Sequence, residues 1–231
     1  MHVAVIPDGN RRWACSKKLA PFAGHKAGAG ALEKIIRSII LAKEIEWFTF
    51  WAASVDNFKK RSQQELFMLN RLFARQFNRL AKYPEIHEYR IRVLVIGKWR
   101  DFLDAKAKKA VEAAMKATAS YRNQTITFLI AYDGKQEMLL TIKKIVEVSR
   151  QAPEICITSE LLKYNLMTSE LPPVDLLIRT GGDPHLSSGF LMWGTADAQL
   201  FFCEKLWPDF TPEDLEIAIM DYKARERRFG A

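Results

Sequence analysis

The chain has 231 residues, 48% of them hydrophobic, and a formal net charge of +8 at pH 7. Its length allows one domain with a sizeable core, and we expect residues 1–231 to form that single domain. No apolar run approaches the roughly 20 residues that a bilayer-spanning helix needs, which excludes a membrane-spanning chain. The positive charge suits binding of polyanions in general and does not indicate which polyanion is bound.

Strand and helix patterns alternate along the chain, which predicts an α/β fold with a mostly parallel sheet of about six strands flanked by helices. Two helix starts are the best defined, because Ser62 with Glu65 and Thr211 with Pro212 form capping patterns. We expect strands near residues 3–7, 47–53, 91–97, 125–132, 174–179 and 199–203, and helices near 27–44, 63–82, 101–119, 135–150, 159–166 and 212–228.

The first predicted strand leads into a cluster of polar residues. Its apolar residues Val3–Ile6 are followed, after a proline, by Asp8-Gly9-Asn10-Arg11-Arg12-Trp13. Glycine lets backbone N–H groups approach an anion, arginine matches phosphate oxygens with forked donors, and a carboxylate beside a diphosphate can hold Mg²⁺. Taken alone, these are also ordinary turn residues, so a plain turn is an equally good interpretation of the segment.

A second cluster at a strand end favours the anion-binding interpretation. The strand predicted at 174–179 ends in Arg179, which is followed by two glycines, His185 and Ser187. Cationic and hydroxyl groups on a short, glycine-containing loop are again suited to an anion. Two such clusters predict sites for two phosphorylated groups.

Further motifs connect these clusters to a known family. They are Gly24-His25, Ser54-Val55-Asp56-Asn57-Phe58, Leu206-Trp207-Pro208-Asp209-Phe210 and the terminal Arg227-Arg228-Phe229-Gly230. Together with the two clusters, they resemble the cis-prenyltransferases, the family that includes undecaprenyl diphosphate synthase, in the family's order along nearly the whole chain. The resemblance implies a Mg²⁺-dependent transferase that condenses isopentenyl diphosphate onto an allylic prenyl diphosphate, with cis double-bond formation, to give a polyprenyl diphosphate.

The resemblance also implies roles for individual residues. Asp8 would be catalytic and carry Mg²⁺, and Arg179, His185 and Ser187 would hold isopentenyl diphosphate. Asn57 matches an asparagine associated with proton removal; because a neutral amide is a poor base, the alternative is that it orders a water or a diphosphate that accepts the proton. The other implied substrate-binding residues are Gly9, Asn10, Arg11, Arg12, Trp13, His25, Ser54, Asp56, Phe58, Lys60, Arg61, Arg228 and Gly230, with Lys60 and Arg61 both eligible for one family arginine.

The helix predicted at 63–82 is apolar around more of its circumference than a surface helix usually is. Burial against the sheet would explain this pattern on general grounds. By resemblance, the helix also lines an apolar tunnel, between helices and sheet, that holds the growing prenyl chain. The apolar residues are Leu66, Phe67, Leu69, Leu72, Phe73, Phe77 and Leu80.

Three positions depart from the family pattern: Pro21 and His185 each stand where an arginine is usual, and Gln199 occupies the place of a glutamate associated with the metal. An amide oxygen can coordinate Mg²⁺ but brings no negative charge, so we expect weaker metal binding unless other groups compensate. Candidate substitutes for the first arginine are Lys17 and Lys18, and candidates to compensate at the metal are Asp183, Asp197 and the substrates.

The expected setting is cytoplasmic, because three widely separated cysteines without a Cys-x-x-Cys pair indicate a reducing compartment, and peripheral membrane contact would serve product release. By resemblance, the Arg228–Gly230 ending reaches across the interface of a homodimer.

A non-catalytic partner subunit is an alternative function, suggested by Gln199, Pro21 and His185 but opposed by Asp8. A basic nucleic-acid-binding domain is suggested by charge alone, and because no such motif is present we expect no nucleic-acid partner.

Overall fold

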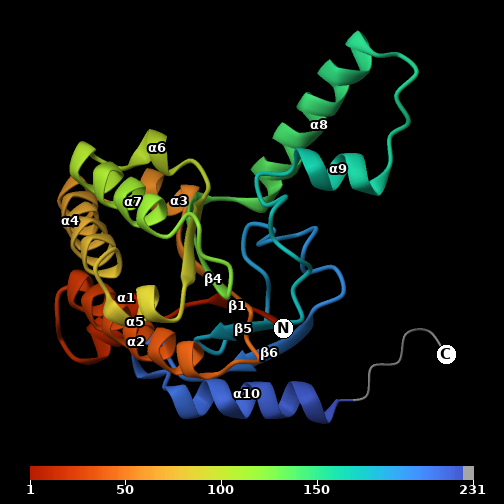
Figure 1. Ribbon diagram of the computed structural model, residues 1–231. Helices are drawn as coiled ribbons and strands as arrows, with labels where there is room; N and C mark the ends of the chain where they lie inside the picture. The colour runs from red at the N-terminus through yellow and green to blue at the C-terminus, as the bar shows by residue number, and fades with distance from the viewer. Residues whose placement is uncertain (226–231) are drawn as a thin grey trace.

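The protein is built on a parallel sheet of six strands, as the computed structural model, which describes residues 1–225, shows (Figure 1). The strand order is β3-β4-β2-β1-β5-β6, and every neighbouring pair is parallel. The predicted fold class and all the predicted strands are therefore confirmed. The strands are β1 (His2–Ile6), β2 (Trp47–Ser54), β3 (Ile91–Ile96), β4 (Gln124–Tyr132), β5 (Leu176–Thr180) and β6 (Gln199–Cys203).

Strand β1 lies in the middle of the sheet and is buried on both faces. Val3 and Val5 belong to the apolar core on one face, and Ala4 and Ile6 to the core on the other. Because side chains alternate between faces, a strand covered on both sides is expected to be apolar at successive positions, as Val3–Ile6 are.

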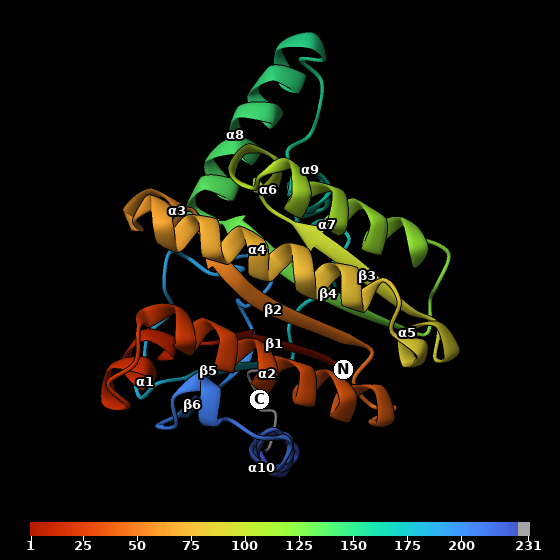
Figure 2. The same ribbon diagram turned by 90° about the vertical axis from the view of Figure 1, so that its left-hand side faces the viewer.

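Helices cover one face of the sheet. The helices α2 (Pro21–Leu41) and α4 (Gln63–Leu80) lie side by side over it, and α7 (Ala105–Ala117) and α10 (Pro212–Ala224) complete the layer (Figure 2). On the other face, residues 166–198 supply most of the cover. The helices α8 (Gly134–Gln151) and α9 (Ser159–Asn165) extend away from the sheet in both views.

Several boundaries differ from those predicted. The helix predicted at 27–44 begins earlier, at Pro21, because a proline suits the first helical turn. The helix predicted at 101–119 is divided into α6 (Trp99–Phe102) and α7, because Asp104 caps α7 by accepting a hydrogen bond from the Ala107 N–H at 2.8 Å. Three short helices and one 3₁₀ turn were not predicted: α1 (Asn10–Ser16), α3 (Val55–Lys60), α5 (Pro84–Glu88) and η1 (Trp207–Asp209).

The parallel sheet brings the carboxyl ends of its strands to one edge. There, Asp8 follows β1, Ser54 ends β2, and Arg179 and Thr180 end β5. The two polar clusters found in the sequence therefore meet at this edge. Within residues 1–225, none of the helices combines the length and the apolar character needed to cross a bilayer.

Candidate functional site

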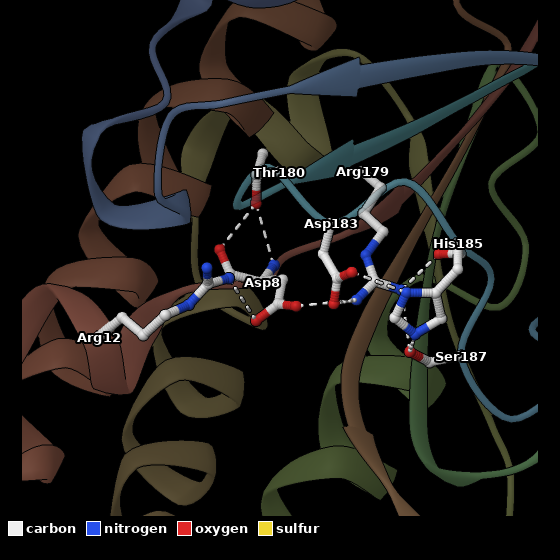
Figure 3. Close-up of polar contacts among 7 residues, drawn as sticks. All are labelled: Asp8, Arg12, Arg179, Thr180, Asp183, His185 and Ser187. Atoms are coloured by element: carbon white, nitrogen blue, oxygen red, sulfur yellow. Dashed lines mark hydrogen bonds and ion pairs between the residues drawn. The ribbon is translucent and has the colours of Figure 1, made fainter.

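Asp8 is held in place by backbone contacts to β5. The Thr180 hydroxyl accepts a hydrogen bond from the Asp8 N–H and donates one to the Asp8 carbonyl oxygen, both at 2.9 Å (Figure 3). In addition, the Asp8 carbonyl oxygen accepts a hydrogen bond from the Trp207 N–H at 2.9 Å. The backbone of Asp8 is thus held by two segments far away in the sequence.

The Asp8 carboxylate joins the two cationic clusters. Its Oδ2 lies 2.9 Å from Nη2 of Arg179, and its Oδ1 lies 3.4 Å from Nη2 of Arg12 (Figure 3). Arg179 is only 3% exposed and also contacts Asp183, at 3.1 Å. Arginine therefore faces this carboxylate from both sides, which places two potential phosphate-binding groups next to each other.

A short chain of hydrogen bonds organises the loop after β5. Asp183 Oδ1 lies 2.9 Å from His185 Nδ1, and His185 Nε2 lies 3.2 Å from the hydroxyl of Ser187. The same hydroxyl accepts a hydrogen bond from Arg179 at 2.9 Å. These contacts bring together Arg179, His185 and Ser187, the three residues expected to hold one diphosphate, and Asp183 orients the imidazole.

Glycine is required at two positions around Asp8. Gly9 has a φ of +105°, and a Cβ there would lie 2.7 Å from Cδ2 of Leu206. Gly181 has a φ of +93°, and a Cβ there would lie 2.5 Å from the guanidinium of Arg12. In both places the backbone adopts a conformation that L side chains rarely take, and it leaves room for a neighbour.

The first polar cluster is a helix rather than a loop after Gly9. Asn10 to Trp13 form the first turns of α1, with Gly9 as its N-cap. The Trp13 indole N–H donates to Asp209 at 2.7 Å, and Lys17 lies 4.8 Å from the centre of the Trp13 ring. Arg11 and Arg12 are exposed on this helix, and the Arg12 guanidinium lies beside Asp8.

A pocket of about 450 Å³ opens beside Asp8 and continues between α2, α4 and the sheet. Its walls away from the opening are mainly apolar. The residues at the opening include Asp8, Asn10, His25, Ser54, Asp56, Asn57, Lys60, Arg61, Arg179 and Ser187, and the apolar walls include Leu32, Ile36, Phe50, Leu69, Leu72, Phe73, Phe77, Leu80, Phe128 and Trp207.

His25 belongs to a buried ionic cluster at the opening. Oε1 of Glu65 lies 3.4 Å from Nε2 of His25 and 3.3 Å from Nε of Arg61, and these side chains are 9–13% exposed. Burial, together with the charge of Arg61, lowers the pKa of His25 to about 4, so its imidazole is neutral near pH 7. A neutral imidazole contributes a hydrogen bond, rather than a charge, to an anion in the pocket.

The segment at 54–58 forms the helix α3, which begins with a capping box. The Ser54 hydroxyl accepts a hydrogen bond from the Asn57 N–H at 3.1 Å, and Asn57 Oδ1 accepts one from the Ser54 N–H at 3.2 Å. The amide oxygen of Asn57 is therefore already engaged. Its amino group is a hydrogen-bond donor, which favours ordering of a water or a diphosphate over direct proton removal.

The structure separates the two candidates for the family arginine. Arg61 is 10% exposed and lies beside His25, whereas Lys60 is 75% exposed and pairs with Asp56 at 2.6 Å. The hydrogen bond and charge of Lys60 also lower the pKa of Asp56. We therefore assign the inner position to Arg61 and the outer rim of the pocket to Lys60 and Asp56.

Not every predicted residue reaches the pocket. Phe58 is 5% exposed and its ring centre lies 5.2 Å from that of Phe102, so it belongs to the core. Gly9, Arg11, Arg12 and Trp13 follow Asp8 in the sequence but do not line the pocket. The predicted residues Arg228 and Gly230 lie outside the described part of the chain.

Gln199 lies away from Asp8 in the same chain, contrary to the expectation of a shared metal. It is the first residue of β6, pairs with Leu176, and is thereby level with Val3 at the start of β1. Five residues separate Val3 from Asp8, which corresponds to about 15 Å along a strand. The two side chains cannot hold one ion within a single chain, because Gln199 lies at the amino ends of the strands and Asp8 at their carboxyl ends.

Asp8 is the best placed carboxylate for a metal. Within residues 1–225, no group of three or more His, Cys, Asp or Glu side chains is arranged to hold a metal ion. Mg²⁺ nevertheless needs only one or two carboxylates when substrate phosphates and waters supply its other ligands. Asp8 lies at the opening of the pocket with its carboxylate 36% exposed, so it fits such a shared site.

Several buried polar atoms at the opening make no hydrogen bond with residues 1–225. They are Asn10 Oδ1, Arg61 Nη1 and Arg179 Nε. Buried polar groups are normally paired, so a concentration of unpaired ones is typical of a site that a polar ligand completes.

Sequence reasoning assigned Glu65 only to a helix cap and gave no role to Thr180. The Ser62 hydroxyl caps α4 by accepting a hydrogen bond from the Glu65 N–H, and the Glu65 side chain connects His25 with Arg61. Its position four residues after Arg61 was the signal for that contact. For Thr180, the sequence carried no comparable signal, because its partner Asp8 is 172 residues away.

Residues 6–230 match the family model for undecaprenyl diphosphate synthase. The tritrans,polycis-undecaprenyl-diphosphate synthase (geranylgeranyl-diphosphate specific) of Pyrococcus abyssi is 37% identical over 239 residues, covering 99% of this chain and 86% of that protein. An isoprenyl transferase of Listeria innocua is 38% identical over 231 residues, covering 99% and 89%. The crystal structure of lavandulyl diphosphate synthase from Lavandula x intermedia in complex with dimethylallyl diphosphate superimposes with a TM-score of 0.92 at 29% identity, covering 100% of this chain and 98% of that one.

Proposed function

Because the chain belongs to the undecaprenyl diphosphate synthase family of cis-prenyltransferases, we propose that it condenses isopentenyl diphosphate onto an allylic prenyl diphosphate to give a cis-polyprenyl diphosphate. One observation carries the proposal: Asp8 joins two arginine-containing clusters at the opening of an apolar pocket. A molecule with a charged head and a long hydrocarbon tail fits that combination.

The allylic substrate occupies the pocket with its diphosphate at the opening. The charges of Arg11, Arg12 and Arg61 stabilise the leaving diphosphate as the C–O bond breaks, and His25 and Asn10 add hydrogen bonds. The hydrocarbon tail extends between α2 and α4, where apolar side chains exclude water.

Isopentenyl diphosphate binds on the other side of Asp8. Arg179 is held in position by its contacts with Asp8, Asp183 and Ser187, and its donors become available to the diphosphate when the two carboxylates give way. Two diphosphates bound on either side of one carboxylate bring the double bond of the second substrate close to the allylic carbon, and this proximity is a large part of the rate. The amino group of Asn57 orders the water or diphosphate oxygen that takes the departing proton.

Mg²⁺ is part of the proposal, with Asp8 and the allylic diphosphate as its ligands. When bound, the ion would neutralise negative charge on the leaving group. Asp8 then has to release at least one of its arginines, which become available to the diphosphates. Gln199 is not a ligand of this site within one chain, for the geometric reason given above.

A homodimer is the proposed assembly, and it rests on the resemblance of the Arg228–Gly230 ending to the family's interface segment. Contact with a membrane surface for product release completes the proposal. The alternative of a non-catalytic partner subunit is not favoured, because the residues around Asp8 form an intact site and the relatives are named as synthases and transferases.

The test is incubation of the purified protein with labelled isopentenyl diphosphate, farnesyl or geranylgeranyl diphosphate, and Mg²⁺, followed by chromatography of the extracted lipids. We expect labelled prenyl diphosphates that require Mg²⁺. Asp8→Ala should abolish them while the fold remains intact by circular dichroism, and Asp101→Ala, an exposed aspartate on α6, should not. Absence of product with every primer, or full activity of Asp8→Ala, would contradict the proposal.

A further inference from the structure

The far end of the pocket is closed by charged residues. The helices α2 and α4 run in the same direction away from the opening, since His25 contacts Glu65 near it and Glu33 contacts Arg79 further along. Eight residues of α2 and 14 residues of α4 separate the two contacts, which corresponds to about 12 and 21 Å of helix. Glu33 and Arg79 both line the pocket.

The closing contact is an ion pair supported by an arginine and a tyrosine. Nη2 of Arg79 lies 2.9 Å from Oε1 of Glu33, and Nη2 of Arg37 lies 3.6 Å from the same oxygen. The Arg37 guanidinium lies 5.1 Å from the centre of the Tyr83 ring. The Tyr83 hydroxyl is buried and makes no hydrogen bond with residues 1–225. The pocket thus ends on polar groups, although its walls are apolar.

Beyond this contact lies a second hollow, on the surface. It is lined by Arg75, Asn78, Arg79, Lys82 and Tyr83, so it shares Arg79 and Tyr83 with the inner pocket. These two side chains therefore form the partition between the pocket and the solvent at this end. The Arg79 and Glu33 side chains are 48% and 32% exposed, so each can turn towards water if the pair separates.

The inner volume limits what fits in front of the partition. A cavity of about 150 Å³ accommodates benzene, which corresponds to roughly 25 Å³ for each carbon atom. On that scale, the pocket volume of about 450 Å³ holds roughly 18 carbon atoms, or between three and four isoprene units. Part of this volume lies at the polar opening, so the apolar section holds no more than this.

We propose that the Glu33–Arg79 ion pair, with Tyr83, is a gate that limits the length of the prenyl chain. The inference rests on the proposed function and concerns the same pocket. A tail that reaches the closed gate meets charged groups that it cannot solvate, so the next condensation is disfavoured and products of about three to four isoprene units accumulate. Longer chains form only when the pair separates and the tail passes into the outer hollow.

The gate is tested by product length in Arg79→Ala, with Arg75→Ala as the matched control. Arg75 lies one turn earlier on α4 and lines only the outer hollow. With isopentenyl and geranyl diphosphates, whose first product has three isoprene units and fits in front of the gate, we expect Arg79→Ala to raise the fraction of products longer than four units several-fold. The control should keep the wild-type distribution. An identical distribution in wild type and Arg79→Ala would overturn the inference while leaving the proposed function intact.

A binding measurement tests the gate without turnover, so it gives a result even if the protein does not catalyse the proposed reaction. Trp51 and Trp207 line the pocket, and their fluorescence should change when it is filled. The wild type should bind farnesyl diphosphate, whose tail fits in front of the gate, much more tightly than undecaprenyl diphosphate, and Arg79→Ala should reduce that ratio several-fold. An unchanged ratio would show that the ion pair does not limit chain length.

Discussion

Replacement of Gly9 by alanine should destabilise the protein by about 3 kcal/mol, from two costs of about 1–3 kcal/mol each. The first is backbone strain, because an alanine has to adopt a φ of +105°. The second is overpacking, because the new Cβ would lie 2.7 Å from Cδ2 and 3.1 Å from Cα of Leu206. A backbone atom cannot turn aside as a side chain can, so the segment that donates from Trp207 to Asp8 has to move.

The assay is urea denaturation followed by circular dichroism, with Gly30→Ala as the matched control. Gly30 lies within α2, and a Cβ there would have no neighbour within 4 Å. Since alanine favours helix, the control should be stabilised by about 0.5–1 kcal/mol. The two changes are chemically identical and should act in opposite directions. If Gly9→Ala unfolds at the wild-type urea concentration, strain and close approach at Gly9 are not what the geometry indicates.

Three further predictions concern pH, the inner arginine and the metal. Burial lowers the pKa of His2 to about 4 from its ordinary value of 6.5. The unfolded state therefore binds a proton more readily, and the free energy of unfolding should fall by about 3 kcal/mol as the pH drops from 6.5 towards 4. In thermal unfolding measured over this pH range, His2→Gln should show a shallower fall in stability than the wild type. Arg61→Lys should raise the KM for the allylic substrate more than Lys60→Ala does, because a lysine loses the forked contact of the buried guanidinium; steady-state kinetics that rank them the other way would assign the role to Lys60. Gln199→Glu should leave the Mg²⁺ dependence of prenyl transfer unchanged, because Gln199 and Asp8 lie at opposite ends of the strands. A lowered Mg²⁺ requirement would show that a second copy of the chain brings the two residues together.

The strands were predictable because each is a short, mainly apolar segment between more polar ones. Val3–Ile6 and Leu176–Ile178 are buried on both faces, and such runs leave little choice of structure. Short helices were harder to predict, because their stability depends on tertiary contacts rather than on length. For α1, the N-cap Gly9 provides no side-chain hydrogen bond, and contacts with α2 and η1 supply the support.

The site was predictable as far as residue types indicate chemistry. Asp8 and Arg179 were identified separately, and the sheet then brought them into contact at 2.9 Å. Phe58 and Gln199 show the limit of this reasoning, because whether a side chain points to a pocket or to the core depends on strand register and helix rotation. Neither quantity can be read from a matching motif.

Arg179 has lost its water before any substrate arrives. Its guanidinium is 3% exposed, and the carboxylates of Asp8 and Asp183 act as its counter-ions in the free protein. A diphosphate that binds there replaces the Asp8 and Asp183 carboxylates and does not have to displace water from the guanidinium. Such an exchange alters the number of bound salt ions very little, so affinity at this position should vary weakly with ionic strength, even though the chain as a whole carries a net charge of +8.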